Sequence, residues 1–118
     1  MTTFWFALED ANIDNGCLWV QPGGQRGPMR ERFVRDGDAI RIEKLEDTPW
    51  PDDSVAVPGE ATAGSLVCFH GLLPHYSAPN RSPLSWHADT RHATDGRTEY
   101  SRHNWIQRGA GFPARGFT

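Results

Sequence analysis

Short apolar runs separated by turn residues recur along this chain, and each has the length of a β-strand. The first run covers residues 3–8, reads TFWFAL and ends at an acidic pair. Continuous apolar runs of roughly four to eight residues, rich in aromatic and β-branched side chains, are typical of buried strands. This run therefore predicts a strand that lies inside a sheet, with neighbours on both sides.

Several later segments have the same character. The dipeptide Asn15-Gly16 is a strong signal for a tight turn, and it leads into an apolar segment at residues 17–20. Further strands are expected at residues 54–58, 65–70 and 85–92. Many short strands at close spacing favour an antiparallel sandwich or barrel.

Two stretches of the chain lack this pattern. Residues 25–51 are polar and charged with few apolar anchors, which predicts an excursion over the surface. Residues 95–118 mix Gly, Arg and isolated aromatic residues, which predicts a surface-wrapping tail. A chain of 118 residues has the size of one small domain. We therefore expect one β domain over residues 1–94, with the excursion inside it and the tail after it.

The amino-acid composition argues against several classes of protein. The 12 Gly and 9 Pro favour turns over long helices, and five Trp with six Phe are too many for a disordered segment. The net charge is −3, the pI is about 5.9, the mean hydropathy is −0.61 and the arginines are scattered, which argues against nucleic acid as a partner. No apolar run is long enough for a membrane span and no secretory signal precedes the first strand, so we expect a soluble, cytoplasmic protein.

The two cysteines predict neither a disulfide nor a structural zinc site. Cys17 and Cys68 both lie in apolar, strand-like segments, and they lack CxxC spacing. We expect both to be buried free thiols.

Histidine is the residue type that points to chemistry. His75 follows a predicted buried strand and a tight Gly-to-Pro corner, and strand alternation places Ser77 on the same face. A rigid corner that presents an imidazole and a hydroxyl to one cavity is typical of a metal and carboxylate site at a barrel mouth. The sequence therefore makes His75 a candidate metal ligand, and the simpler alternative is a turn histidine without a partner.

Other polar residues have simpler explanations. His70 ends an apolar strand and is expected to be a hydrogen-bonded structural histidine. The sequence His87-Ala88-Asp89 has the His-x-Asp pattern of iron ligands, but without the surrounding context chance spacing explains it better. Glu9 and Asp10 are neighbours at a strand end and point to opposite faces, which favours solvation and turn capping over an acid-base pair.

An ordered set of motifs runs through nearly the whole chain. Its members are Trp5-Phe6-Ala7-Leu8-Glu9-Asp10-Ala11, Asn15-Gly16-Cys17-Leu18, Pro22-Gly23, Gly64-Ser65-Leu66-Val67, His70-Gly71 with His75, and Asn104-Trp105. In this order and spacing, the set resembles the phytanoyl-CoA dioxygenase family, and most of all its cytosolic domain-containing subgroup.

The resemblance implies a double-stranded β-helix, which is a jelly-roll or cupin-like antiparallel barrel. It implies Fe(II) and 2-oxoglutarate as cofactors and the hydroxylation of an aliphatic carbon in a small-molecule substrate. By the same resemblance His75 is an iron ligand, Ser77 is a hydroxyl that contacts 2-oxoglutarate, and Trp5 is a ring that lines the same pocket.

This sequence departs from the family pattern in two ways. The family's other two iron ligands form a His-x-Asp pair before the strand that corresponds to residues 3–8. The family also places an arginine, which clamps a carboxylate of 2-oxoglutarate, where this chain has Trp86. We therefore expect an incomplete β-helix that lacks its first strands and is inactive by itself, with no catalytic residue assigned.

Two other functions remain open from the residues alone. The chain could be a non-catalytic β domain whose open sheet edge pairs with another chain, or with a second copy to form a homodimer. It could also be a cupin-like metal hydrolase or isomerase that uses several of its histidines.

Overall fold

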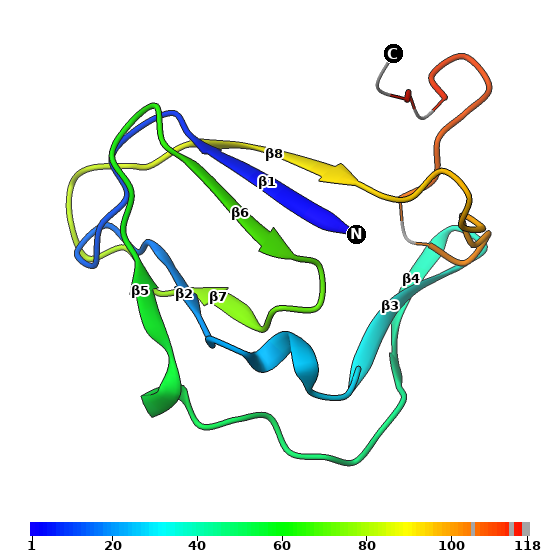
Figure 1. Ribbon diagram of the computed structural model, residues 1–118, viewed down its shortest axis with the longest axis horizontal. Coiled ribbons are helices and arrows are strands. Elements are labelled where there is room, and N and C mark those ends of the chain that lie inside the picture. The colour runs from blue at the N-terminus through cyan, green and yellow to red at the C-terminus, as the bar shows by residue number, and fades with distance from the viewer. Residues whose placement is uncertain (105, 114, 117–118) are drawn as a thin grey trace. The chain divides into compact units, whose positions relative to one another are not determined.

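The structure is a computed structural model that describes residues 1–104, 106–113 and 115–116. It contains eight strands and two single-turn 3₁₀ helices in the described ranges, and no α-helix is found there (Figure 1). In chain order these elements are β1 (Thr2–Ala7), β2 (Leu18–Val20), η1 (Gly24–Arg26), β3 (Glu31–Asp36), β4 (Ala39–Lys44), η2 (Asp53–Val55), β5 (Val57–Gly59), β6 (Leu66–His70), β7 (His75–Ser77) and β8 (Ala88–Ala93). The mostly β fold class predicted from the sequence is confirmed.

The chain divides into two compact units. The first, here called the sheet unit, consists of Met1–Gly27 and Trp50–Thr94. The second, here called the hairpin unit, consists of Pro28–Pro49 and Asp95–Thr118. The domain boundaries expected from the sequence stay a prediction.

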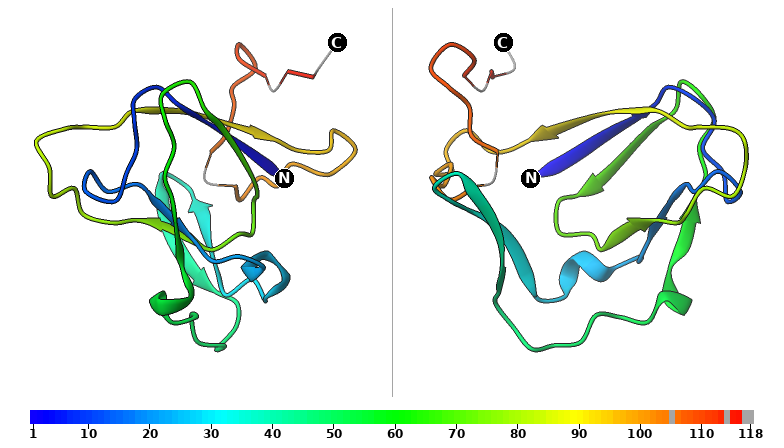
Figure 2. Two further views of the ribbon diagram at one scale, coloured as in Figure 1. Left: turned by 60° about the vertical axis from the view of Figure 1, so that its left-hand side comes forward. Right: turned by 180° about the vertical axis from the view of Figure 1, so that it is seen from behind.

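The sheet unit contains two three-stranded antiparallel sheets. Their strand orders are β6-β1-β8 and β5-β2-β7. In the first sheet Trp5 pairs with Val67 on one side and with Thr90 on the other. The views of Figure 2 agree that β1, in dark blue, runs between β6 and β8. In both sheets the central strand is the one that comes first in the sequence.

The core of the sheet unit forms on one face of β1. Thr3, Trp5 and Ala7 are buried there, whereas Phe4 and Phe6 on the other face are partly or largely exposed. The run at residues 3–8 was expected to be buried throughout, and that expectation is wrong for this outer face. The inner-face core cluster consists of Trp5, Ala7, Ala11 and Cys17, packed against Leu18, Ala61, Val67, Phe69, Trp86 and Ala88.

Three local predictions need correction. Residues 53–55 form a 3₁₀ turn instead of a strand, because Asp52 accepts a hydrogen bond from the Ser54 N–H at 2.8 Å and the strand β5 begins only at Val57. Strand β8 begins at Ala88, three residues later than expected. Both cysteines are free, as predicted, and Cys17 is fully buried, but Cys68 is exposed.

The hairpin unit holds a β-hairpin that the sequence analysis did not predict. Strands β3 and β4 pair in antiparallel register, with Phe33 opposite Ile42. The backbone N–H of Arg35 donates to the carbonyl of His103 at 2.9 Å, which ties the hairpin to the later part of the unit. Trp105, from the Asn104-Trp105 match, lies outside the described residues.

A buried arginine closes the base of the segment between residues 28 and 49. Arg30 is 8% exposed, and its guanidinium donates to the carbonyl oxygens of Pro28, Thr48 and Pro49 at 3.0–3.3 Å. Because several carbonyls share one charged donor, the two ends of the segment are held together.

Candidate functional site

The corner before β7 fixes the imidazole of His75. The ring atom Nδ1 of His75 lies 2.8 Å from the carbonyl oxygen of Leu73. Because a carbonyl oxygen can only accept, Nδ1 carries a proton, and in the neutral imidazole the lone pair is on Nε2. A backbone carbonyl that orients the distal nitrogen in this way is the usual support of a metal-binding histidine. His70 accepts from the Leu72 N–H at 3.1 Å, which is the structural role expected for it.

The three residues assigned from the resemblance lie on two sheets. His75 and Ser77 stand two residues apart on β7, so strand alternation puts them on one face, and both are exposed. Trp5 is buried on β1 in the other sheet. Phe69 connects the two, because it packs against the core cluster of Trp5 while its ring lies 5.1 Å from the imidazole of His75.

Trp86 occupies the space next to Trp5. The two ring centroids are 5.7 Å apart at an interplanar angle of 54°. The indole Nε1–H of Trp86 donates to the carbonyl oxygen of Gly16 at 3.1 Å. A tilted aromatic pair of this kind is favourable beyond the apolar area it buries. Trp86 therefore anchors the segment before β8 to the core and to the turn that ends at Gly16.

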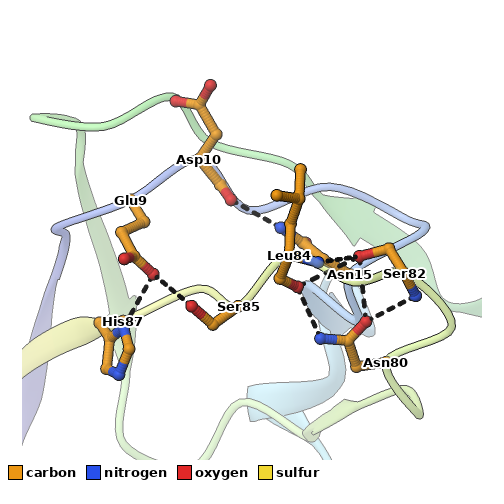
Figure 3. Close-up of polar contacts among 8 residues, drawn as sticks. All are labelled: Glu9, Asp10, Asn15, Asn80, Ser82, Leu84, Ser85 and His87. Carbon is orange, nitrogen blue, oxygen red and sulfur yellow. Dashed lines mark hydrogen bonds and ion pairs between the residues drawn. The ribbon is translucent and has the colours of Figure 1, made fainter.

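A carboxylate, an imidazole and a hydroxyl meet where β1 ends and β8 begins. The Glu9 atom Oε2 lies 2.7 Å from Nδ1 of His87 and accepts from the Ser85 hydroxyl at 3.2 Å (Figure 3). The hydrogen bond from His87 is the main cause that lowers the pKa of Glu9 below its ordinary value of 4.5. Glu9 and Asp10 point in different directions, as expected, but Glu9 is bound to other side chains and not simply solvated.

The pair of Glu9 and His87 predicts an acid-dependent contribution to stability. Because the pKa of Glu9 is lowered on folding, its stabilising effect is present above pH 4.5 and is lost as the pH falls through the folded-state value. We expect the difference in free energy of unfolding between the wild type and Glu9→Gln to shrink as the pH falls from about 6 to about 3. Urea unfolding at a series of pH values measures it.

The control for this experiment is His87→Gln, which removes the partner and keeps the carboxylate. This variant should lose the same pH-dependent contribution as Glu9→Gln. A wild-type protein whose stability relative to both variants does not change with pH would contradict the assignment.

An iron site with a facial triad requires three protein ligands, two imidazoles and one carboxylate. Among the residues that the structure describes, no group of three or more His, Cys, Asp and Glu side chains is arranged to hold a metal ion. His87 is engaged by Glu9, and Asp89 pairs with Arg91 at 2.8 Å, so the His-x-Asp pattern at residues 87–89 serves other contacts. His75 fits one ligand position of an iron site, but the residues present do not fit the ion by themselves.

The fold matches part of a solved oxygenase. The structure of EvdO2 from Micromonospora carbonacea var. aurantiaca, complexed with 2-oxoglutarate, superposes with a TM-score of 0.54 at 25% sequence identity. The match covers 80% of this chain and 40% of that chain. The sheet arrangement is therefore part of the double-stranded β-helix fold of the 2-oxoglutarate oxygenases.

Sequence comparison identifies the family within this class. The family model described as phytanoyl-CoA dioxygenase (PhyH) matches residues 1–88, and the chain belongs to this family, as its motifs predicted. Phytanoyl-CoA dioxygenase 1 of Oryza sativa subsp. japonica is 43% identical over 110 residues, which cover 91% of this chain and 38% of the relative. Phytanoyl-CoA dioxygenase domain-containing protein 1 of Bos taurus is 40% identical over 106 residues, which cover 87% of this chain and 36% of the relative.

The chain thus spans about two fifths of the length of the curated relatives it matches. The family uses Fe(II) and 2-oxoglutarate and acts on small-molecule substrates. In the described ranges, no helix has the length and apolar character needed to cross a membrane.

Proposed function

We propose that this chain supplies one part of an Fe(II)- and 2-oxoglutarate-dependent oxygenase site and does not turn over 2-oxoglutarate by itself. In this proposal His75 offers Nε2 to the iron, while Ser77 and Trp5 line the side where 2-oxoglutarate binds. The family's activity, the hydroxylation of an aliphatic carbon, belongs to the whole site. The cytoplasmic location inferred from the sequence is part of the same proposal.

The observation that carries the proposal is the position of Trp86. An arginine at this place would give a carboxylate two parallel charged hydrogen bonds. The indole has one N–H donor, and the carbonyl oxygen of Gly16 already accepts it at 3.1 Å. The ring face packs against Trp5. A dicarboxylate would therefore meet an apolar surface without a counter-charge, which disfavours binding.

The iron side of the site supports the same conclusion. One imidazole supplies one of the three protein ligands that a facial triad requires. Within the described part of the chain, His75 belongs to no group of three or more His, Cys, Asp and Glu side chains that could hold a metal ion. Tight iron binding would need donors that this part of the protein does not offer.

Anaerobic titration with Fe(II) and 2-oxoglutarate tests the proposal. The 118-residue chain is expected to show no metal-to-ligand charge-transfer band and to form no succinate under air, because neither cofactor finds its full set of contacts. The curated relative from Oryza sativa provides the positive control. A band with stoichiometric iron that disappears in His75→Ala would refute the proposed inactivity and would support the assignment of His75.

Replacing Trp86 by arginine isolates the 2-oxoglutarate contact. A bidentate charged pair contributes about 1.5–3 kcal/mol, so Trp86→Arg should bind 2-oxoglutarate at least about tenfold more tightly than the wild type. The control is Trp86→Phe, which keeps a ring against Trp5 and adds no charge. Isothermal titration calorimetry measures the affinities, and near-UV circular dichroism checks that each variant is folded. Equal affinities in the three proteins would show that Trp86 does not limit the binding of 2-oxoglutarate.

A second function is favoured by the sheet edges. β6, β8, β5 and β7 each pair with one neighbour within the described ranges, so each leaves one edge open to a further strand. A non-catalytic β domain could pair through such an edge with another chain or with a second copy. Sedimentation equilibrium over a range of concentrations distinguishes the cases, because a homodimer through an edge predicts a reversible doubling of mass and a persistent monomer excludes it.

A further inference from the structure

A cavity of about 330 Å³ lies beside the β7 corner, within the sheet unit. It borders His75 but otherwise uses residues that the proposed oxygenase site does not. The residues that define its character are Trp50, Pro74 and Tyr76, which carry rings, and Gln21 and Asp53, which carry polar side chains. Its volume falls in the range of sites that bind small molecules.

Gln21 places an unmet acceptor at this cavity. The residue is 7% exposed, and its backbone N–H donates to the carbonyl oxygen of Pro74 at 3.1 Å. The oxygen Oε1 of its side chain is buried and has no hydrogen-bond partner in the described part of the protein. Because a buried acceptor without a partner is unfavourable, this oxygen favours a ligand that brings an N–H or O–H donor.

The charges around the cavity have one sign. Asp53 contributes a carboxylate. No lysine or arginine is among the described residues that line the cavity. An anionic ligand such as a dicarboxylate therefore finds no counter-charge there.

We propose that this cavity binds a small organic ammonium compound with a flat apolar body. The flat body would pack against the ring of Trp50 and against the face of Tyr76 that is not stacked on Trp19. Aromatic faces also attract a cation. The ammonium N–H groups would donate to Oε1 of Gln21 and to the carboxylate of Asp53. The proposal goes beyond the oxygenase function and does not depend on iron or on 2-oxoglutarate.

Three probes with one body and different head groups test the charge preference. These probes are phenethylamine, 2-phenylethanol and 3-phenylpropionate, titrated into the metal-free 118-residue protein at neutral pH and low salt. We expect phenethylamine to bind about tenfold more tightly than 2-phenylethanol, and 3-phenylpropionate to bind most weakly. Calorimetry gives the affinities. Equal affinities for the three probes, or no binding of phenethylamine at millimolar concentration, would overturn the proposal.

Variants of the two polar residues test the assigned contacts. Gln21→Leu keeps the approximate volume and removes the acceptor, so it should weaken phenethylamine binding about tenfold and leave 2-phenylethanol binding less affected. Asp53→Asn should weaken it about threefold, because the carboxylate is exposed and screened by water. The control Asp14→Asn removes an exposed carboxylate away from the cavity and should have no effect.

The test remains decisive if a variant is unstable. Unchanged phenethylamine affinity in a folded Gln21→Leu protein would refute the role of Gln21. If Gln21→Leu does not fold, the order of the three probes on the wild type and the effect of Asp53→Asn decide the matter. The experiment uses no iron, so its failure leaves the oxygenase proposal intact, and the reverse also holds.

Discussion

Gly16→Ala is expected to lower the free energy of unfolding by about 2–5 kcal/mol. Gly16 has a φ of 84°, a left-handed conformation that is strained for any residue with a Cβ. A Cβ at this position would lie 2.4 Å from the carbonyl oxygen of Ala78 and 3.1 Å from the backbone nitrogen of Asn80. Because both atoms belong to the backbone, the turn or the segment after β7 would have to shift.

Gly23→Ala is the matched control for this prediction. Gly23 has a similar φ of 80°, but nothing lies within 4 Å of the position that its Cβ would take. Gly23→Ala should therefore lower the free energy of unfolding through backbone strain alone, by about 1–2 kcal/mol. Urea unfolding of both variants measures the difference. Equal costs would show that the close approach of Ala78 to Gly16 does not exist in solution.

Trp5→Ala is expected to lower the free energy of unfolding by about 3–5 kcal/mol. Trp5 is 4% exposed at the centre of the core cluster, and its ring packs against Trp86. The substitution removes the largest apolar side chain of that cluster and leaves a cavity that its neighbours fill incompletely. Since domains have total stabilities of about 5–15 kcal/mol, this loss removes a third or more of the stability of an average domain, and the melting temperature should fall clearly.

An exposed leucine provides the comparison for Trp5→Ala. The side chain of Leu84 is one of the more exposed large apolar groups, at 65%, so Leu84→Ala should change the stability by less than about 0.5 kcal/mol. Thermal unfolding followed by near-UV circular dichroism measures both variants. A Trp5→Ala protein with the stability of Leu84→Ala would place Trp5 outside the core.

Local sequence patterns were enough to predict the turn at Asn15-Gly16 and several of the strands. Asn15-Gly16 predicted a tight turn, and the structure shows why both residues are required there. The side chain of Asn15 accepts from the backbone N–H of Asn12 and donates to the carbonyl of Asp10, and the backbone N–H of Asn15 donates to the side chain of Asn12. Gly16 supplies the positive φ. The apolar pattern alone fits either an antiparallel sandwich or a barrel. The ordered motifs indicated the family, and the family implied the double-stranded β-helix.

Features that depend on distant parts of the chain could not be predicted in the same way. The contact of Glu9 with His87 joins two segments that are far apart in the sequence. No local pattern indicates this contact, because the two residues meet only when β1 and β8 are paired. The cavity beside Gln21 likewise forms only when Asp53 and Tyr76 are brought to it. The hairpin of β3 and β4 was missed for a local reason, since charged residues interrupt its apolar alternation.

The placement of the earliest strands at the sheet centres has a consequence for folding kinetics. In the described parts of the chain β1 pairs with β6 and β8, and β2 pairs with β5 and β7, so neither sheet contains a pair of described strands adjacent in sequence. Loops must therefore close before any of these ladders can form, and such topologies refold slowly, on the order of milliseconds to seconds. The local hairpin β3-β4 can form within about 1–10 μs. During refolding β1 and its aromatic residues stay unpaired until β6 and β8 reach them. Aggregation competes with folding during this interval.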